Sequence, residues 1–342
     1  MPLKIIVTGA AGFIGFHTCK RLLKEKCEVI GIDNINDYYD INLKLSRLKE
    51  IESFSKYHGN WYFKKGSIEN NELIINTFSE FKPDIVIHLA AQAGVRYSIN
   101  HPQKYISSNI VGFFNIIESC RKFDVKNFLY ASSSSVYGGN KNLPYKENNS
   151  VDHPISLYAA TKKSNEVIAH SYSHLYNIPC TGIRFFTVYG PWGRPDMAPM
   201  IFTNSIIRKE PIKIFNNGKM KRDFTYIDDV VEAIYRCMLK PAVSNSSFNM
   251  FDPEPSTSFC SHRIFNLGNS NPVELLEFIN CIETELGIKA IKEYLPLQPG
   301  DVEETFADNT SLNQWINFYP KTSLKDGIKD FLSWYKIFYK IN

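Results

Sequence analysis

A tyrosine and a lysine four positions apart, Tyr158 and Lys162, are side chains that could move a proton to or from a substrate. On a helix, residues at this spacing share a face. An ammonium group beside a phenol favours the phenolate and lowers the phenol pKa from its usual value of about 10, which would make the tyrosine a general base. Ser156 is a candidate N-cap for the helix. Tyrosine and lysine at this spacing are also common on helix surfaces, so the pair needs support from other motifs.

Four consecutive serines, Ser132 to Ser135, follow an apolar run that predicts a strand. Ligands of open α/β sheets bind beyond the carboxyl ends of the strands. A serine hydroxyl at this point could hydrogen-bond the substrate oxygen that Tyr158 deprotonates. Without the other motifs, a serine-rich turn would be read as an ordinary loop.

Three glycines near the N-terminus, Gly9, Gly12 and Gly15, form a G-x-x-G-x-x-G turn between a predicted strand and a predicted helix. Such a turn lets the backbone approach a pyrophosphate, whose charge the helix N-terminus stabilises. Asp33 ends the second predicted strand, and a carboxylate there can accept hydrogen bonds from ribose hydroxyls and disfavours a 2′-phosphate. The turn and Asp33 therefore predict NAD rather than NADP, although Asp33 alone could simply cap a loop.

The elements that must position these residues alternate along the first half of the chain. Short apolar runs without polar alternation predict strands that are buried on both faces, and helical patterns lie between them. The strands are expected at Lys4–Thr8, Glu28–Asp33, Ile85–Ala90, Asn127–Ser132 and Cys180–Phe186, and the helices at Phe13–Lys26, Glu72–Phe81, Ile110–Lys122 and Leu157–Tyr176. The alternation predicts an α/β fold with a Rossmann-type, doubly wound parallel sheet.

The second half of the chain lacks this regular alternation of predicted strands and helices. Prolines interrupt the pattern after about Gly190, Ser244–Ser261 has a loop composition, and Leu324–Tyr339 has helical apolar spacing. We expect an NAD-binding domain at residues 1–186 and a smaller α/β substrate-binding domain at 187–342. A segment near 222–240 is expected to return to the first domain.

Composition excludes several classes of protein. The 342 residues carry 39 basic and 35 acidic side chains, a net charge of +4, with no basic stripe interleaved with aromatic residues. We therefore expect no nucleic-acid partner. No apolar run reaches the length of a membrane span, so no membrane partner is expected. The seven cysteines are scattered and form no C-x-x-C, which predicts a cytoplasmic protein with neither a disulfide framework nor a metal site.

Five longer motifs make the sequence similar to a known family. They are His88–Tyr97, Ala131–Gly138, Arg184–Met197, Lys219–Asp229 and Pro299–Val302. With the glycine turn, they resemble the extended short-chain dehydrogenase/reductase superfamily and, within it, the UDP-glucuronate 4-epimerases. The resemblance covers nearly the whole chain. It implies a tightly held NAD and a UDP-sugar substrate.

The resemblance also implies roles for individual residues. Tyr158 would be the base, Lys162 would orient the nicotinamide ribose, and Ser133 would contact the reacting 4-hydroxyl. Cofactor contacts are implied for Gly9, Gly12, Phe13, Ile14, Gly15, Asp33, Ser67, Ile68, Ala90, Gln92, Asn109, Tyr158 and Lys162. Ser67 stands where the family usually has an acid near the adenine.

The two residues that follow the catalytic serine indicate which reaction to expect. Dehydratases and decarboxylases of the superfamily usually place an acid after that position, whereas this chain has Ser134 and Ser135. A transient 4-keto sugar without that acid can only be reduced again, so the resemblance implies interconversion of UDP-glucuronate and UDP-galacturonate. Ser134 is therefore counted with the catalytic group.

The remaining substrate contacts are also implied by the family. Arg194 and Thr187 are candidates for the sugar carboxylate, which arginine can bind in bidentate fashion. Arg222 would bind the diphosphate, Ile214 and Phe215 would flank the uracil, and Asp301 would meet the uridine ribose. Arg96 is a further cation within a matched motif, and Ser135 lies beside the catalytic serine.

Three alternatives stay open at this point. Arg194 could be a solvated loop residue, in which case the protein would be a UDP-hexose or UDP-N-acetylhexosamine 4-epimerase. The chain could also be a cofactor-binding regulator without catalysis, although Tyr158, Lys162 and Ser133 are all present. The family further implies a homodimer through the helices at Ile110–Lys122 and Leu157–Tyr176.

Overall fold

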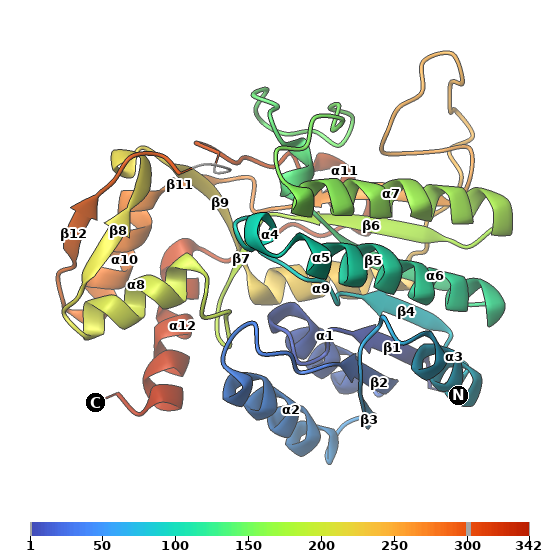
Figure 1. Ribbon diagram of the computed structural model, residues 1–342, viewed down its shortest axis with the longest axis horizontal. Helices are drawn as coiled ribbons and strands as arrows, with labels where there is room; N and C mark the ends of the chain where they lie inside the picture. Colours follow the sequence, from blue (N-terminus) through green and yellow to red (C-terminus); the bar gives the residue numbers. More distant parts are fainter. Residues whose placement is uncertain (1, 299–301, 342) are drawn as a thin grey trace.

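A seven-stranded parallel sheet forms the centre of the molecule. The computed structural model describes residues 2–298 and 302–341 (Figure 1), so Asp301 lies outside the described residues. The strand order is β10-β6-β5-β4-β1-β2-β3. The bounds are β1 Lys4–Thr8, β2 Glu28–Asp33, β3 Asn60–Lys65, β4 Ile85–His88, β5 Asn127–Ser133, β6 Cys180–Phe185 and β10 His262–Leu267. This order confirms the predicted doubly wound fold.

Helices cover both faces of this sheet, which is why its central strands are apolar throughout. One core joins side chains of α1 and α9 to the sheet, and the other joins side chains of α3, α6 and α7 to it. All side chains of β4 and β6 are buried. The helices are α1 Phe13–Lys24, α2 Ile41–Ser55, α3 Asn71–Phe81, α6 Phe113–Lys122, α7 Leu157–Tyr176 and α9 Ile227–Leu239.

Two short helices and a π-helical segment connect β4 to α6. They are α4 Tyr97–Asn100, α5 Pro102–Tyr105 and the π-helix Ile106–Gly112. The predicted helix at Ile110–Lys122 therefore begins, as an α-helix, only at Phe113. The π-helical turn brings Asn109 into a buried position beside α7.

The smaller lobe contains two small sheets and three helices, at the left of Figure 1. One sheet has the order β11-β9-β7 and the other pairs β12 with β8. The bounds are β7 Thr187–Tyr189, β8 Pro211–Ile214, β9 Lys221–Tyr226, β11 Pro272–Glu274, β12 Ile291–Tyr294, α8 Ala198–Ile207, α10 Leu275–Leu286 and α12 Leu324–Tyr339.

Segments after residue 187 contribute to both lobes. The helix α9 packs on α1, and β10 forms one edge of the central sheet, where α11 (Thr310–Ile316) contacts it. The division of the chain at residue 186 stays a prediction. Within the described part of the chain, no helix is long and apolar enough to cross a bilayer.

Candidate active site

A cavity of about 1250 Å³ lies at the carboxyl ends of the central strands, between the two lobes. Its walls bring together the glycine turn, the serine run, the start of α7 and the segment that carries Arg194. Most of the residues predicted for cofactor and substrate line it. These are Gly9, Gly12, Phe13, Ile14, Gly15, Asp33, Ser67, Ile68, Ala90, Gln92, Arg96, Ser133, Ser134, Ser135, Tyr158, Lys162, Thr187, Arg194, Phe215 and Arg222.

The glycine turn forms a cradle that side chains would fill. Gly9 has a φ of +73°, and a Cβ added there would lie 2.8 Å from the main-chain nitrogen of Ala90. A Cβ on Gly15 would lie 2.0 Å from the Gly9 carbonyl oxygen. The amide of Gly12 donates to that same oxygen at 2.9 Å, and α1 begins at the next residue. The turn thus leaves backbone and a helix N-terminus open to an anion, which fits a dinucleotide pyrophosphate.

Asp33 closes the far end of this turn. Its two carboxylate oxygens accept hydrogen bonds from the amides of Ala11 at 3.0 Å and Ile35 at 2.8 Å. Burial raises the pKa of Asp33, and these two hydrogen bonds partly oppose that rise. Asp33 therefore both holds the turn, as the loop-capping alternative anticipated, and borders the cavity where a ribose would lie.

Asn109 acts from behind the cavity wall and does not line it. Its amide oxygen accepts a hydrogen bond from the main-chain nitrogen of Gln92 at 2.8 Å, and its amide nitrogen donates to the Gln92 carbonyl at 3.1 Å. The same nitrogen donates to the Thr161 hydroxyl at 3.0 Å. Asn109 thus ties Gln92 to α7.

The start of α7 places Tyr158 and Lys162 in the cavity. The Ser156 hydroxyl caps this helix by accepting from the Ala159 amide at 3.1 Å. The Lys162 ammonium donates to the carbonyl of Ala131 on β5 at 2.8 Å, and burial lowers the pKa of Lys162 to about 8. Burial raises the pKa of Tyr158, whereas a hydrogen bond with Ser133 and the charge of Arg194 lower it. The predicted pair is therefore in the cavity, with a serine beside the phenol.

Ser133 is the last residue of β5 and caps the short 3-10 helix Ser134–Tyr137 that follows it. Its hydroxyl accepts from the Ser135 amide at 3.2 Å and donates to the Ser135 hydroxyl at 3.1 Å. These bonds orient the Ser133 oxygen toward Tyr158, as its effect on the Tyr158 pKa requires. Ser134 also lines the cavity.

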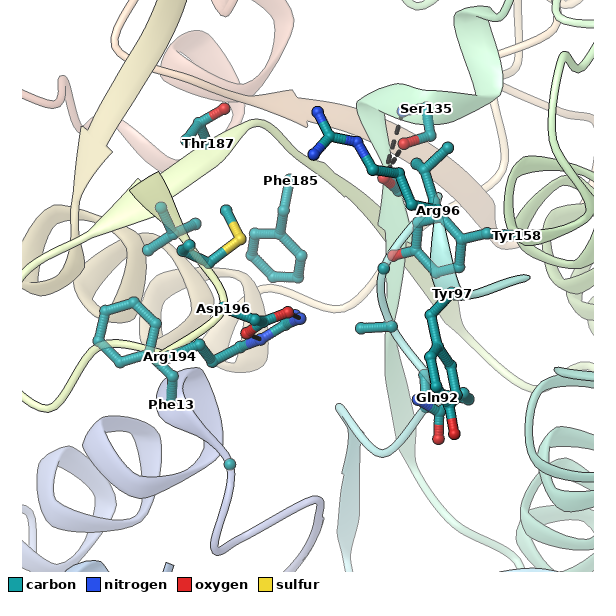
Figure 2. A pocket seen from close by; sticks show the side chains of 18 of the residues that line it. Phe13, Gln92, Arg96, Tyr97, Ser135, Tyr158, Phe185, Thr187, Arg194 and Asp196 are labelled. Atoms are coloured by element: carbon teal, nitrogen blue, oxygen red, sulfur yellow. Dashed lines mark hydrogen bonds and ion pairs between the residues drawn. The ribbon is translucent and has the colours of Figure 1, made fainter. Parts of the chain in front are cut away.

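Arg194 is paired within the cavity by a residue that the sequence motifs did not single out. Its guanidinium donates to both oxygens of Asp196, at 3.0 and 2.5 Å, and Tyr38 donates to Asp196 at 3.0 Å. Figure 2 shows this pair near Phe13, on the opposite side of the view from Tyr158. Burial would raise the pKa of Asp196, but Arg194 and Tyr38 lower it on balance, so Asp196 is ionised at neutral pH.

The other predicted substrate residues occupy different parts of the wall. The Arg96 guanidinium lies 5.2 Å from the centre of the Phe215 ring, and Figure 2 places Arg96 close to Ser135 and Tyr158. Arg222 donates to the carbonyls of Val302 and Glu303 at 2.6 and 3.0 Å.

Ile214 differs from the expectation. It is fully buried and does not line the cavity, whereas Ile212 and Lys213 of the same strand border it.

The parallel sheet, the glycine turn and the Tyr158–Lys162 pair together define a class, the extended short-chain dehydrogenases/reductases. The chain belongs to the NAD dependent epimerase/dehydratase family, which matches residues 5–250, and its cofactor is NAD.

Relatives extend over the whole chain. Protein CapI of Staphylococcus aureus is 52% identical over 99% of this chain and 100% of its own length. A probable UDP-glucuronate 4-epimerase of Rhizobium meliloti is 42% identical over 97% of both chains. The crystal structure of UDP-glucuronic acid 4-epimerase from Bacillus cereus, in complex with UDP-glucuronic acid and NAD, superposes with a TM-score of 0.84 at 31% identity, over 98% of this chain and 100% of the other.

Proposed function

We propose that the protein is a UDP-sugar 4-epimerase that interconverts UDP-glucuronate and UDP-galacturonate. The observation that supports an acidic substrate is the position of Arg194, a cation on the wall of the same cavity as Tyr158. The positive charge of Arg194 lowers the pKa of Tyr158. A sugar whose C4 hydroxyl meets Tyr158 can therefore present a nearby carboxylate to Arg194. The relatives named as UDP-glucuronate epimerases support the same substrate.

The chain's own residues account for the proton transfers. Tyr158, as the phenolate, accepts the proton of the 4-hydroxyl and later returns it to the same oxygen. Ser133, which hydrogen-bonds the Tyr158 phenol in the structure, is assigned to that oxygen. Lys162, one turn further along α7, is assigned to the electrostatic support of the phenolate. When bound, NAD supplies the hydride acceptor and then the hydride donor at C4. The site thus returns every proton and electron it removes, as an epimerisation requires.

The lack of an acid beside Ser133 favours re-reduction over elimination. Ser134 and Ser135 occupy the two positions after Ser133, and both border the cavity. Neither hydroxyl has the basicity to remove a proton from the carbon next to a ketone. The site therefore offers the 4-keto sugar no route to elimination, and hydride return to the opposite face, after the sugar has turned, gives the epimer.

A 4-keto sugar acid decarboxylates readily, so the carboxylate has to be held out of alignment for loss of CO₂. A bidentate arginine contact fixes the plane of a carboxylate. We assign this function to Arg194, with the Thr187 hydroxyl as a second donor on the same wall. Arg222 and Phe215, at the other end of the cavity, are assigned to the diphosphate and the uracil.

The test is product analysis by anion-exchange chromatography after incubation with UDP-glucuronate. We expect UDP-galacturonate from the native protein and none from Tyr158→Phe, which should still bind the substrate. For Arg194→Gln we expect the KM for UDP-glucuronate to rise by about 10- to 100-fold, the loss of a charged hydrogen-bonded contact, and CO₂ to be released. An NAD-loaded native protein that leaves UDP-glucuronate unchanged would refute the proposal.

One observation favours a second candidate, a UDP-hexose or UDP-N-acetylhexosamine 4-epimerase. Asp196 already neutralises Arg194 in the structure, so the wall carries no net charge at that point. A neutral 6-hydroxymethyl group would then need no exchange of ion pairs. Competition between UDP-glucuronate and UDP-glucose for the same site distinguishes the two substrates.

We also propose a homodimer through the outer faces of α6 and α7 and the π-helical segment that precedes α6. This face exposes Ile106, Val111, Phe114 and Val167. A groove of about 540 Å³ runs between Ile106 and Val167. Light scattering should give twice the chain mass, and Val167→Glu should reduce it to the mass of one chain. A monomeric native protein would refute the assembly without affecting the catalytic proposal.

A further inference from the structure

Arg47 on α2 is a fully buried cation that connects two walls of the cavity. One of its terminal nitrogens donates to the carbonyl of Ala11 at 2.8 Å and to the hydroxyl of Tyr39 at 2.7 Å. The other donates to the carbonyls of Trp192 at 2.6 Å and Gly193 at 3.3 Å. Arg47 has no solvent exposure. A single guanidinium thus holds backbone groups that lie more than 180 residues apart in the chain.

Both segments that Arg47 holds belong to the site. Ala11 lies inside the glycine turn between Gly9 and Gly12, and Trp192 and Gly193 immediately precede Arg194. The guanidinium is planar and presents its donors in a fixed fork, so its two ends cannot be re-aimed independently. A shift of the turn is therefore transmitted to the backbone next to Arg194.

The segment before Arg194 is also anchored on the first helix of the dinucleotide-binding lobe, and its Trp192 ring packs in addition against two aromatic rings of α12. The His17 ring hydrogen-bonds the carbonyl of Pro191 at 2.9 Å. The Trp192 ring lies 5.1 Å from the ring of Phe16 on the same helix. Trp192 itself has a φ of +62°, a conformation that a bulky residue adopts only when its surroundings impose it. The path of this segment thus depends on the elements that form the glycine turn.

The electrostatics of Arg47 also point toward the cofactor. Within residues 2–298 and 302–341, its hydrogen-bond acceptors are three carbonyls and a hydroxyl, and no carboxylate forms an ion pair with it. Its Nε has no acceptor among those residues. The Asp33 carboxylate at the glycine turn acts on Arg47 only through space. Burying a cation without a directly paired carboxylate is costly, and a further anion at the glycine turn offsets part of that cost. Binding of the dinucleotide diphosphate therefore strengthens the arrangement that Arg47 maintains.

We propose that Arg47 is a positioning residue that couples occupation of the glycine turn to the placement of the backbone beside Arg194. Binding of the cofactor fixes the Ala11 carbonyl, Arg47 carries that constraint to Trp192 and Gly193, and Arg194 is thereby set for the substrate. The consequence for the sugar carboxylate rests on the proposed function, whereas the coupling itself does not.

The coupling can be measured by hydrogen exchange on protein freed of cofactor, with NAD added back. In the native protein, NAD should slow amide exchange both at residues 9–15 and at residues 190–196. In Arg47→Met, NAD should still slow exchange at 9–15 but no longer at 190–196. Undiminished protection of 190–196 in this variant would overturn the proposal. Lys49→Met, which removes an exposed cation from the same helix, should behave as the native protein.

A second variant covers the case in which Arg47→Met does not fold, as judged by circular dichroism. Arg47→Lys keeps the charge, but one ammonium cannot hold both segments with the geometry of a planar fork. We expect a folded protein in which the NAD-dependent protection of 190–196 falls at least threefold. Native-like protection in Arg47→Lys would show that charge alone suffices and would overturn the proposed bridge.

Kinetics provide the third readout. With NAD saturating, Arg47→Lys should raise the KM for UDP-glucuronate about tenfold, change kcat less, and leave the Kd of UDP unchanged. An equal loss for UDP would indicate general damage and overturn the positioning role. If the native protein does not convert UDP-glucuronate, the proposed function fails, yet the exchange experiment still tests Arg47.

Discussion

Glu166 and Arg184 form a bidentate, fully buried ion pair directly behind the catalytic serines. The Arg184 guanidinium donates to the two Glu166 oxygens at 2.8 and 2.9 Å. Ser132 donates to the same carboxylate at 2.6 Å, and Ser132 is the register partner of Arg184 across β5 and β6. Since Glu166 lies one turn beyond Lys162 on α7, this pair fixes the catalytic helix to the strands that carry the serines.

Removing one partner should cost much more here than at the surface. Arg184→Met leaves Glu166 buried and unpaired, so we expect a loss of about 3 to 5 kcal/mol in the free energy of unfolding. The control is Arg121→Met, which breaks a partly exposed pair with Glu118 and should cost much less. Urea denaturation measures both. Similar losses in the two variants would show that the buried pair has no special role.

A second prediction concerns Glu147, a buried carboxyl group on the same network. It accepts a hydrogen bond from the Asn266 amide at 2.9 Å, and burial raises its pKa from the ordinary 4.5 to about 7. A raised pKa means that the folded state favours the neutral acid. Stability is therefore full below about pH 4.5 and is lost as the pH rises through about 7.

The isosteric variant Glu147→Gln removes this titration and keeps an oxygen for Asn266. Relative to the native protein, we expect it to be more stable at pH 8, by up to about 3 kcal/mol, and equally stable near pH 4.5. Thermal unfolding at the two pH values measures this difference. A Glu147→Gln variant that is less stable at pH 8 would mean that the ionised carboxylate is the favoured form.

The parts of the fold that sequence reasoning predicted are those in which local pattern and burial agree. The strands β1, β2, β4, β5 and β6 are rich in apolar residues and buried along most of their length because helices cover both of their faces. In contrast, β3 is an edge strand with partly exposed residues and no comparable run. The edge strand β10 pairs with β6 from about 80 residues away, and no local feature of the sequence shows that pairing.

The residues of the site can likewise be separated into those that the sequence predicted and those that it did not. Gly9, Asp33, Ser133 and Tyr158 belong to short motifs, and their places in the cavity follow from the strand or helix that carries each motif. The roles of Arg47 and Glu166 depend on contacts with distant segments, which a motif does not contain. Asp196 lies in the same motif as Arg194, but its contact with Tyr38 comes from a distant segment. Arg47 reads in the sequence as a polar residue on a surface helix, although it is completely buried.

A third prediction is the pH dependence of turnover. Tyr158 must lose its proton to act as a base, whereas Lys162 must keep its own to support the phenolate, and burial lowers the Lys162 pKa to about 8. On balance the pKa of Tyr158 is raised and lies above that of Lys162. We therefore expect kcat to rise with pH up to about 8, to level off as Lys162 loses its proton, and to fall only above the Tyr158 pKa. Lys162→Met should reduce kcat at pH 7 by at least about 100-fold and move the rising limb to higher pH.

The adjacent Lys163 serves as the control for this profile. It lies on the same helix and pairs with Asp152 at 3.8 Å. Lys163→Met should retain the native pH profile, since its charge does not face the phenol. An unshifted rising limb in Lys162→Met would remove the electrostatic role of Lys162 and leave it only a structural one.

The last prediction concerns the competition between Asp196 and the substrate for Arg194. Asp196 is ionised at neutral pH and holds the Nε–Nη2 edge of the guanidinium, one of the two edges with which arginine can bind a carboxylate in bidentate fashion. An acidic substrate must displace or share this partner, whereas a neutral sugar meets no such competition.

Asp196→Asn removes the competing charge and retains one oxygen that can accept from Arg194 and Tyr38. We therefore expect the KM for UDP-glucuronate to fall about 3- to 10-fold, and the KM for UDP-glucose to stay unchanged, in initial-rate assays with NAD saturating. A rise in the KM for UDP-glucuronate would instead show that Asp196 holds Arg194 in its productive position, and an equal change for both sugars would place Arg194 away from C6.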